Sequence, residues 1–262
     1  MFPRGTGVAL HQSTDLRSDL WAGLRQGVLV AVAALVLILP PGRVAKPDAA
    51  ATVSAPAPAV FRTADFADHP ASPDVRFIAD WATASADSHG LPFIVLDKRD
   101  ARVFVFTNQG RLIDSSPVLL GAAPGDDAVP DIGTRPMANV RQDEKTTPAG
   151  RFVAQAGKNA SAEDVVWVDY TNAVSMHRVR LVDPKERRLE RLASPDPTQR
   201  RISYGCINVP VAFFESVVWP LLSSTRAVVY VLPEVRGLHE IFAGAYAAPG
   251  EPRQGEPTAA HL

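Results

Sequence analysis

The chain has 262 residues, of which 46% are hydrophobic, and this is enough for one core of ordinary size. Its 27 Lys and Arg nearly balance 28 Asp and Glu, for a formal net charge of −1, so the composition argues against a nucleic-acid-binding protein. Because there is a single cysteine, an intrachain disulfide is excluded.

An unbroken apolar run lies near the N-terminus, at residues 28–39. It is shorter than the roughly 20 residues of a membrane-spanning helix, but it has the length of the apolar part of an export signal, about 7–15 residues. Residues 1–51 are therefore predicted to be an export signal cleaved near 49–51, or a retained membrane anchor over 20–39. In either case the rest of the chain is expected outside the cytoplasm, in the periplasm or cell envelope, and would meet the membrane only through an uncleaved anchor.

Composition divides the remainder into three parts. Residues 52–72 are rich in Ala and Pro and predict an extended linker. Residues 73–235 carry the hydrophobic patterning of one folded domain. Residues 236–262 end in a polar, Pro- and Gly-rich stretch and predict a disordered tail.

The domain opens with a predicted helix at 75–88. Short β-branched and aromatic runs separated by turn residues then predict strands: 93–97, 102–107, 112–120, 151–156, 165–170, 173–177 and, last, 227–232. The stretch between the third and fourth of these, 121–150, is predicted to be a loop. A charged insert at 182–201 and a helix at about 211–218 precede the last strand. This order predicts a mostly β sandwich or barrel and argues against a parallel βαβ fold.

The only cysteine, Cys206, lies in the segment SYGCIN at 203–208. Free cysteine is often just a small buried hydrophobe, but an unpaired thiol in an oxidising compartment is a liability that needs a reason. Its glycine turn precedes a predicted helix, whose dipole would favour the thiolate. His177, at the end of a strand-like segment, is the candidate base for covalent acyl transfer.

Three motifs follow one another along the chain: TPAGRF at 147–152, Met-His at 176–177, and SYGCIN at 203–208. In this order they resemble the catalytic domain of the L,D-transpeptidases, the YkuD family, over about residues 91–233. The first block is similar to the family's TPxGxF. The last is similar to its S/T-H-G-C-hydrophobic-N/R block, and it is the most specific of the three.

The resemblance implies a YkuD-like β-sandwich or barrel with a short helix after the cysteine. It implies a cysteine enzyme that acts on peptidoglycan stem peptides, releases D-alanine from a tetrapeptide and passes the acyl group to an amine. Cys206 would be the nucleophile, which a carbapenem would acylate, and His177 the base, oriented by the backbone carbonyl of Arg178. No cofactor is expected, because neither metal-ligand spacing nor a phosphate-binding loop is present.

The same resemblance assigns roles to the residues around the cysteine. The backbone N–H groups of Tyr204, Gly205 and Cys206 are the expected oxyanion donors. Ser203 and Asn208 are expected to support the turn or to contact substrate.

Two departures from the family pattern leave alternatives open. Tyr204 stands where the family has a histidine, and a tyrosine hydroxyl could replace a histidine that only shapes the site. The gap between His177 and Cys206 is wider than usual, which fits the insert at 182–201 looping out as a lid. The alternatives are a carboxypeptidase or endopeptidase with water as acceptor, and a wall-binding domain without catalysis.

Overall fold

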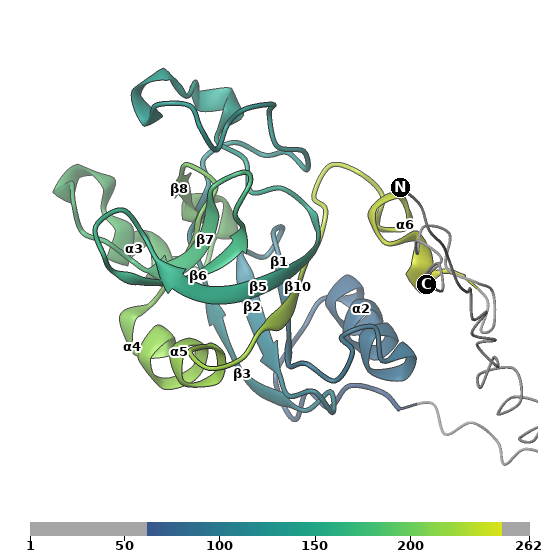
Figure 1. Cartoon of the computed structure of the whole chain (residues 1–262). Coiled ribbons are helices and arrows are strands. Elements are labelled where there is room, and N and C mark those ends of the chain that lie inside the picture. The colour runs from purple at the N-terminus through teal and green to yellow at the C-terminus, as the bar shows by residue number, and fades with distance from the viewer. Residues whose placement is uncertain (1–61, 248–262) are drawn as a thin grey trace, which may run out of the picture. The chain divides into compact units, whose positions relative to one another are not determined.

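The computed structural model describes residues 62–247 of the chain (Figure 1). The predicted export signal or anchor at 1–51 lies outside these residues, as do residues 52–61 of the predicted linker and residues 248–262 of the predicted tail. Within 62–247, every helix is too short or too polar to cross a membrane.

The fold is mostly β, as the sequence predicts, and its centre is a mixed eight-stranded sheet in the order β3-β2-β1-β10-β5-β6-β7-β9. The strands of this sheet are β1 (Phe93–Asp97), β2 (Arg102–Phe106), β3 (Leu112–Pro117), β5 (Gly150–Lys158), β6 (Asp164–Asp169), β7 (Val174–Arg178), β9 (Ile207–Val209) and β10 (Ala227–Val231). A small parallel pair, β4 (Leu120–Gly121) with β8 (Arg201–Ser203), accompanies it. Most neighbours in the large sheet are antiparallel, but β1 pairs in parallel with β10 and β7 with β9.

Helices cover the two sides of the sheet (Figure 1). The long one, α2 (Pro73–Ser85), begins where Ser72 caps it by accepting a hydrogen bond from the Val75 N–H at 3.3 Å. The shorter ones are α3 (Arg188–Ala193), α4 (Val211–Phe213), α5 (Trp219–Leu222) and α6 (Leu238–Ile241). Residues 214–218 continue α4 as a wider turn of π type into α5, so the predicted helix at 211–218 extends to residue 222.

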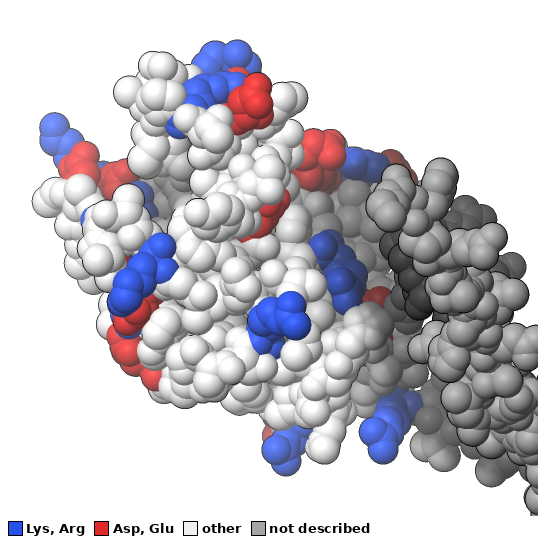
Figure 2. All heavy atoms as spheres, in the orientation of Figure 1, with Lys and Arg blue, Asp and Glu red and all other residues white. Residues whose placement is uncertain are grey.

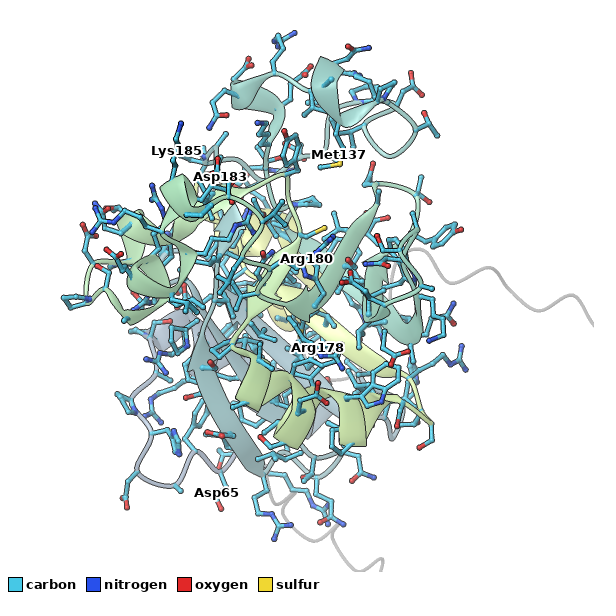
Figure 3. The ribbon with its side chains drawn as sticks, turned by 90° about the vertical axis from the view of Figure 1, so that its left-hand side faces the viewer. Asp65, Met137, Arg178, Arg180, Asp183 and Lys185 are labelled. Carbon is cyan, nitrogen blue, oxygen red and sulfur yellow. The ribbon has the colours of Figure 1, made fainter. Side chains whose placement is uncertain are left out.

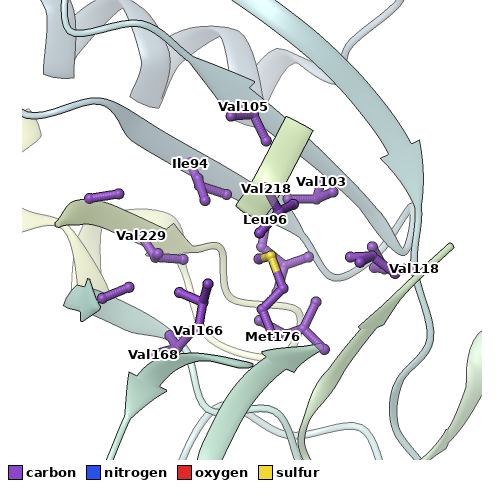
Figure 4. Packing of buried hydrophobic residues seen from close by; sticks show 14 of the residues in the cluster. Ile94, Leu96, Val103, Val105, Val118, Val166, Val168, Met176, Val218 and Val229 are labelled. Carbon is purple, nitrogen blue, oxygen red and sulfur yellow. The ribbon is translucent and has the colours of Figure 1, made fainter. Parts of the chain in front are cut away.

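The main hydrophobic core lies on the side of the sheet that packs against α4 and α5. One face of nearly every strand contributes to it, from Ile94 and Leu96 on β1 to Met176 on β7 (Figure 4). Because strands from both ends of the sheet reach the same cluster, the sheet has to curve around it. The curved sheet corresponds to the barrel or sandwich that the sequence predicts.

A second core lies on the opposite face of β1, β2 and β10, beneath α2. Phe93, Val95 and Phe104 are buried there together with Ile78 of the helix. These three strands are therefore buried on both faces. Burial on both faces explains why their sequences are continuous apolar runs, without the polar alternation of half-buried strands.

The folded unit extends past both predicted boundaries, and this corrects the limits of 73 and 235. Phe66, inside the predicted linker, is 4% exposed and stacks edge-on against Phe106 with 5.2 Å between ring centroids. Phe242, inside the predicted disordered tail, is also 4% exposed and contacts Tyr230. Single aromatic residues within polar or Pro-rich stretches set up no periodicity, so the sequence pattern did not reveal them.

Candidate active site

The parallel pairing of β7 with β9 brings the two predicted reacting residues together. The register sets Met176 opposite Ile207 and His177 opposite Asn208. Met176 and Ile207 both point into the main core and are fully buried. Because side chains alternate along a strand, His177 and Asn208 face the other side of the sheet, where Cys206 joins them just ahead of β9.

The imidazole of His177 is held in one orientation by the backbone. Its Nδ1 lies 2.7 Å from the carbonyl oxygen of Arg178. A carbonyl can only accept a hydrogen bond, so Nδ1 carries a hydrogen and Nε2 is the ring nitrogen that is left to exchange a proton. His177 can therefore take up and return a proton through Nε2.

The Arg178 side chain points away from this centre. Its Nε donates to Glu215 at 2.5 Å, and its guanidinium lies 4.2 Å from the ring centre of Phe214. Figure 3 shows Arg178 beside the helical segment 211–222. Arg178 therefore contributes its backbone carbonyl to the site and its side chain to the packing of that segment.

The thiol of Cys206 has polar neighbours and is partly exposed. Its Sγ lies 3.5 Å from the carbonyl oxygen of Ala173 and 3.6 Å from the hydroxyl of Ser175. Desolvation alone would raise the pKa of the Cys206 thiol, but the hydrogen bond and charge of His177, with the hydrogen bonds of Ser175, lower it below its ordinary value. The thiol is thus biased toward the nucleophilic thiolate.

The predicted contribution of a helix dipole to this thiolate is wrong. Strand β9 separates Cys206 from the helical segment, which begins only at Val211. The field of a helix terminus falls off within about one turn, so the polar groups of β7 account for the lowered pKa instead.

The turn that carries Cys206 requires a glycine. Gly205 has a φ of +130°, and a Cβ at this position would lie 2.6 Å from the carbonyl oxygen of Thr146. Ser203 braces the turn, since its hydroxyl accepts from the Gly205 N–H at 3.1 Å and donates to the Cys206 carbonyl at 2.6 Å. The Gly205 N–H, one of three predicted oxyanion donors, is therefore already engaged by the Ser203 hydroxyl.

Thr147 lies outside the turn at 203–206 but holds it in place, and the sequence had not suggested a role for it. Its buried hydroxyl donates to the Gly205 carbonyl and accepts from the Gly121 N–H, both at 2.9 Å. Thr147 is the first residue of the TPAGRF motif, and this motif is the sequence feature that could have pointed to it. Ser175 was missed as well, although it lies two positions before His177 on the same strand and therefore on the same face.

Asn208 lies directly behind the reacting pair and is 1% exposed. Its Nδ2 donates to the Cys206 carbonyl at 3.2 Å and is 3.5 Å from His177 Nε2. Its Oδ1 accepts from Arg188 at 2.6 Å. Within the described structure these contacts hold the Asn208 amide against the turn that carries Cys206.

Tyr204, at the position where the resembled family has histidine, is 40% exposed. The Lys145 ammonium lies 3.9 Å above the centre of its ring. The ring also lines a small pocket together with Val129, Ile132 and Val174. At this position the aromatic ring of Tyr204 thus contacts Lys145 and lines the small pocket.

The surface charge is mixed. On the face drawn in Figure 2, Lys and Arg side chains are dispersed and several lie beside Asp or Glu. Within residues 62–247, no group of three or more His, Cys, Asp or Glu side chains is arranged to hold a metal ion. The reactive groups assembled here are a thiol of lowered pKa and a histidine whose ring is oriented by a backbone carbonyl.

No family model matches the sequence, and neither does any curated protein. Among solved structures, the chain is similar to a Cys-to-Ser mutant of the Enterococcus faecium L,D-transpeptidase, with 17% identity and a TM-score of 0.31 over 53% of this chain and 49% of that one. It is also similar to the catalytic domain from the E. faecium L,D-transpeptidase, with 15% identity and a TM-score of 0.29 over 54% of this chain and 98% of that one.

A third similar structure is the helical cell shape determining protein Pgp2 from Campylobacter jejuni, with 13% identity and a TM-score of 0.33 over 60% of this chain and 55% of that one. The chain spans about half the length of the first of these structures. Identities and TM-scores of this size carry no functional argument, so the function has to be argued from the residues of the site.

Proposed function

We propose that the protein is a peptidoglycan L,D-transpeptidase that works through a cysteine acyl-enzyme. The observation that carries this proposal is the Cys206 thiol of lowered pKa, on a braced glycine turn beside His177, whose Nδ1 is bonded to the Arg178 carbonyl. The order of TPAGRF, Met-His and SYGCIN along the sequence supports it. The same residues support the more general proposal that the protein has a role in peptidoglycan metabolism.

In the first half-reaction the Cys206 sulfur attacks the carbonyl between the L-centre of diaminopimelate and the terminal D-alanine. His177 Nε2 accepts the thiol proton as the C–S bond forms. When the tetrahedral intermediate collapses, the C–N bond breaks and the same proton passes to the leaving amine of D-alanine. A thioester on Cys206 is left.

In the second half-reaction an amine of another stem peptide attacks that thioester. His177 takes a proton from the amine, the new amide bond forms and the Cys206 thiolate leaves, after which the proton returns to it. With water in place of the amine, the same steps give hydrolysis.

The developing oxyanion needs donors that are not already engaged. Because the Gly205 N–H donates to Ser203, we assign this role to the backbone N–H groups of Tyr204 and Cys206. Loss of one oxyanion donor typically raises the barrier by about 2.7–4 kcal/mol. The bracing of the turn by Ser203 is therefore expected to matter for the rate as well as for stability.

The experiment that tests the proposal is mass spectrometry of the purified full chain after incubation with disaccharide-tetrapeptide. We expect a cross-linked dimer formed with loss of D-alanine, and no such product with Cys206→Ala or with His177→Ala. A carbapenem should add its mass to the wild-type protein and not to Cys206→Ala.

The other outcomes would overturn the proposal in distinct ways. A tripeptide without dimer would identify a hydrolase with water as the acceptor. If neither product forms and a carbapenem leaves Cys206 unmodified, the enzyme assignment fails in favour of a wall-binding domain.

The proposed substrate lies outside the cytoplasm, which agrees with the export predicted from residues 1–51. We accordingly propose a periplasmic or cell-envelope location. Fractionation of cells that carry the full chain would test this, and recovery of the chain only in the cytoplasmic fraction would contradict it.

A further inference from the structure

The insert between β7 and β8, predicted to loop out as a lid, is docked on the domain. Leu192 of α3 is 6% exposed and packs with Leu119 and Val179. Arg191 ties the insert to itself, since it donates to the carbonyls of Glu186 and Gln199, both at 2.8 Å. The insert therefore has a fixed position from which it can present side chains to the site.

One of these side chains reaches the reacting centre. The Arg188 side chain is 13% exposed and makes two charge-assisted hydrogen bonds, from Nε to the Glu186 carboxylate at 2.5 Å and from Nη1 to the Asn208 Oδ1 at 2.6 Å. Such bonds are about twice as strong as neutral ones. Because these two hydrogen bonds point in different directions, they fix the orientation of the planar guanidinium group.

The bond to Arg188 determines which way the Asn208 amide faces. A guanidinium can only donate, so the amide oxygen has to face Arg188. The NH₂ group is then directed at the Cys206 carbonyl, 3.2 Å away, and at His177 Nε2, 3.5 Å away. The Asn208 backbone is fixed too, because its N–H and C=O pair with Leu119 at 2.9 and 2.8 Å.

We propose that Arg188 is a positioning residue that acts through Asn208 on the Cys206–His177 pair. It holds the amide so that its NH₂ supports the carbonyl of the nucleophile and faces the Nε2 edge of the imidazole. This inference rests on the cysteine–histidine chemistry of the proposed function, but it does not depend on the identity of the substrate. It gives the insert a role that its charged sequence alone does not indicate.

The test uses the fact that Cys206 is the only cysteine. Alkylation of the full chain by iodoacetamide at neutral pH therefore reports on this thiol alone. We expect Arg188→Met to slow alkylation about 10-fold, the factor that follows from a change of about 1.4 kcal/mol in a barrier. Arg188→Lys keeps one donor for Asn208, so it should restore the rate to within about 3-fold of wild type.

Arg191→Met is the matched control, because it removes two hydrogen bonds of the insert and leaves the Arg188–Asn208 contact in place. Its alkylation rate should equal that of the wild type. In a double-mutant cycle, Arg188→Met should add no further slowing to Asn208→Ala, since both remove the same support.

Two results would overturn the inference: an unchanged rate in Arg188→Met, or equal slowing in Arg188→Met and Arg191→Met, which would assign the effect to docking of the insert. Additive effects of Arg188→Met and Asn208→Ala would equally contradict action through Asn208. The test is independent of peptidoglycan, so a protein that makes no dimer but shows the expected alkylation pattern would refute the proposed function and leave this inference intact.

Discussion

A single buried hydroxyl, that of Thr147, joins three segments of the chain at the cysteine turn. It bonds the carbonyl of Gly205 and the N–H of Gly121, while the Thr147 carbonyl accepts from the Lys98 ammonium at 2.9 Å. Buried polar groups that lose their partner cost about 1–3 kcal/mol each. At the scale of one residue, the geometry of the turn that carries Cys206 therefore depends on the Thr147 side chain, which bonds the turn at the Gly205 carbonyl.

We expect Thr147→Val, which keeps the shape and removes the hydroxyl, to lower the free energy of unfolding by about 2–4 kcal/mol, because two buried backbone groups lose their partner. Urea unfolding measures this change, and iodoacetamide should also alkylate Cys206 more slowly.

The neighbouring Thr146→Val is the control for this change. The Thr146 hydroxyl makes an exposed hydrogen bond to the Asp127 carbonyl at 3.0 Å, so its loss should change the stability by no more than about 0.5 kcal/mol. Equal effects of the two substitutions would contradict the role given to Thr147.

At the scale of elements, a buried ion pair connects the turn after β1, the loop at 121–150 and the chain after β10. Lys98 is fully buried and donates to Asp126 at 2.7 Å and to the Gly125 carbonyl at 2.5 Å. Asp126 accepts three backbone N–H groups, from residues 234–236. The loop that leads into TPAGRF is thereby fixed to the ends of β1 and β10, two neighbouring strands of the sheet.

This pair should give the stability a specific dependence on pH. Burial by itself would raise the pKa of Asp126, but the backbone N–H of Arg236, the Lys98 ammonium and the N–H groups of Glu234 and Val235 together lower it from 3.8 to about 2. The folded-state pKa is thus below the unfolded one. Its stabilisation, about 2 kcal/mol, is complete above pH 4 and is lost as the pH falls from about 4 to 2.

We expect Asp126→Asn to lower the free energy of unfolding at pH 7 by about 3–5 kcal/mol, because it leaves a buried ammonium poorly paired. Between pH 4 and 2 the variant should lose less stability than the wild type, which urea unfolding at several pH values measures.

Asp127→Asn provides the comparison, since Asp127 is 76% exposed and pairs only at the surface with Arg236. Such pairs contribute about 0–1 kcal/mol. Parallel pH profiles for wild type and Asp126→Asn would show that Asp126 does not carry the acid sensitivity.

At the scale of the whole molecule, one sheet carries a core on each face, and the two ends of the described chain close the second core. Phe66 and Phe242 pack on the face of β1, β2 and β10 that α2 covers. His177 lies on β7 and Cys206 just ahead of β9, at the far end of the sheet order, and the main core lies behind these two strands. The second core therefore stabilises the central strands without touching the site.

We expect Phe242→Ala to destabilise the protein by about 3–5 kcal/mol, the usual cost of removing a buried phenylalanine. Thermal unfolding measures the loss, and iodoacetamide alkylation of the protein that is still folded should be unchanged.

Tyr246 lies in the same C-terminal segment but is 53% exposed. Tyr246→Ala should therefore lower the stability by well under half as much as Phe242→Ala. Comparable losses from the two substitutions would mean that the segment 236–247 is held by something other than the burial of Phe242.

The sequence by itself determined the mostly β class and the longer strands in their order along the chain, and it singled out Cys206 and His177 as candidates. The short strands β4, β8 and β9 were not predicted. The predicted features depend on residues that are close in sequence: strands buried on both faces are continuous apolar runs, and the only cysteine follows a glycine in a turn. Local patterns report which positions are buried or turned, because these depend on alternation over a few residues.

Only the tertiary structure decided which groups surround the thiol. Ser175 meets Cys206 across 31 residues of sequence, Arg188 meets Asn208 across 20, and Thr147 meets Gly205 across 58. These contacts follow from the parallel pairing of β7 with β9 and from the docking of the insert. Burial patterns show that a strand needs a neighbour, but the neighbour is chosen by how the whole sheet curves around its core.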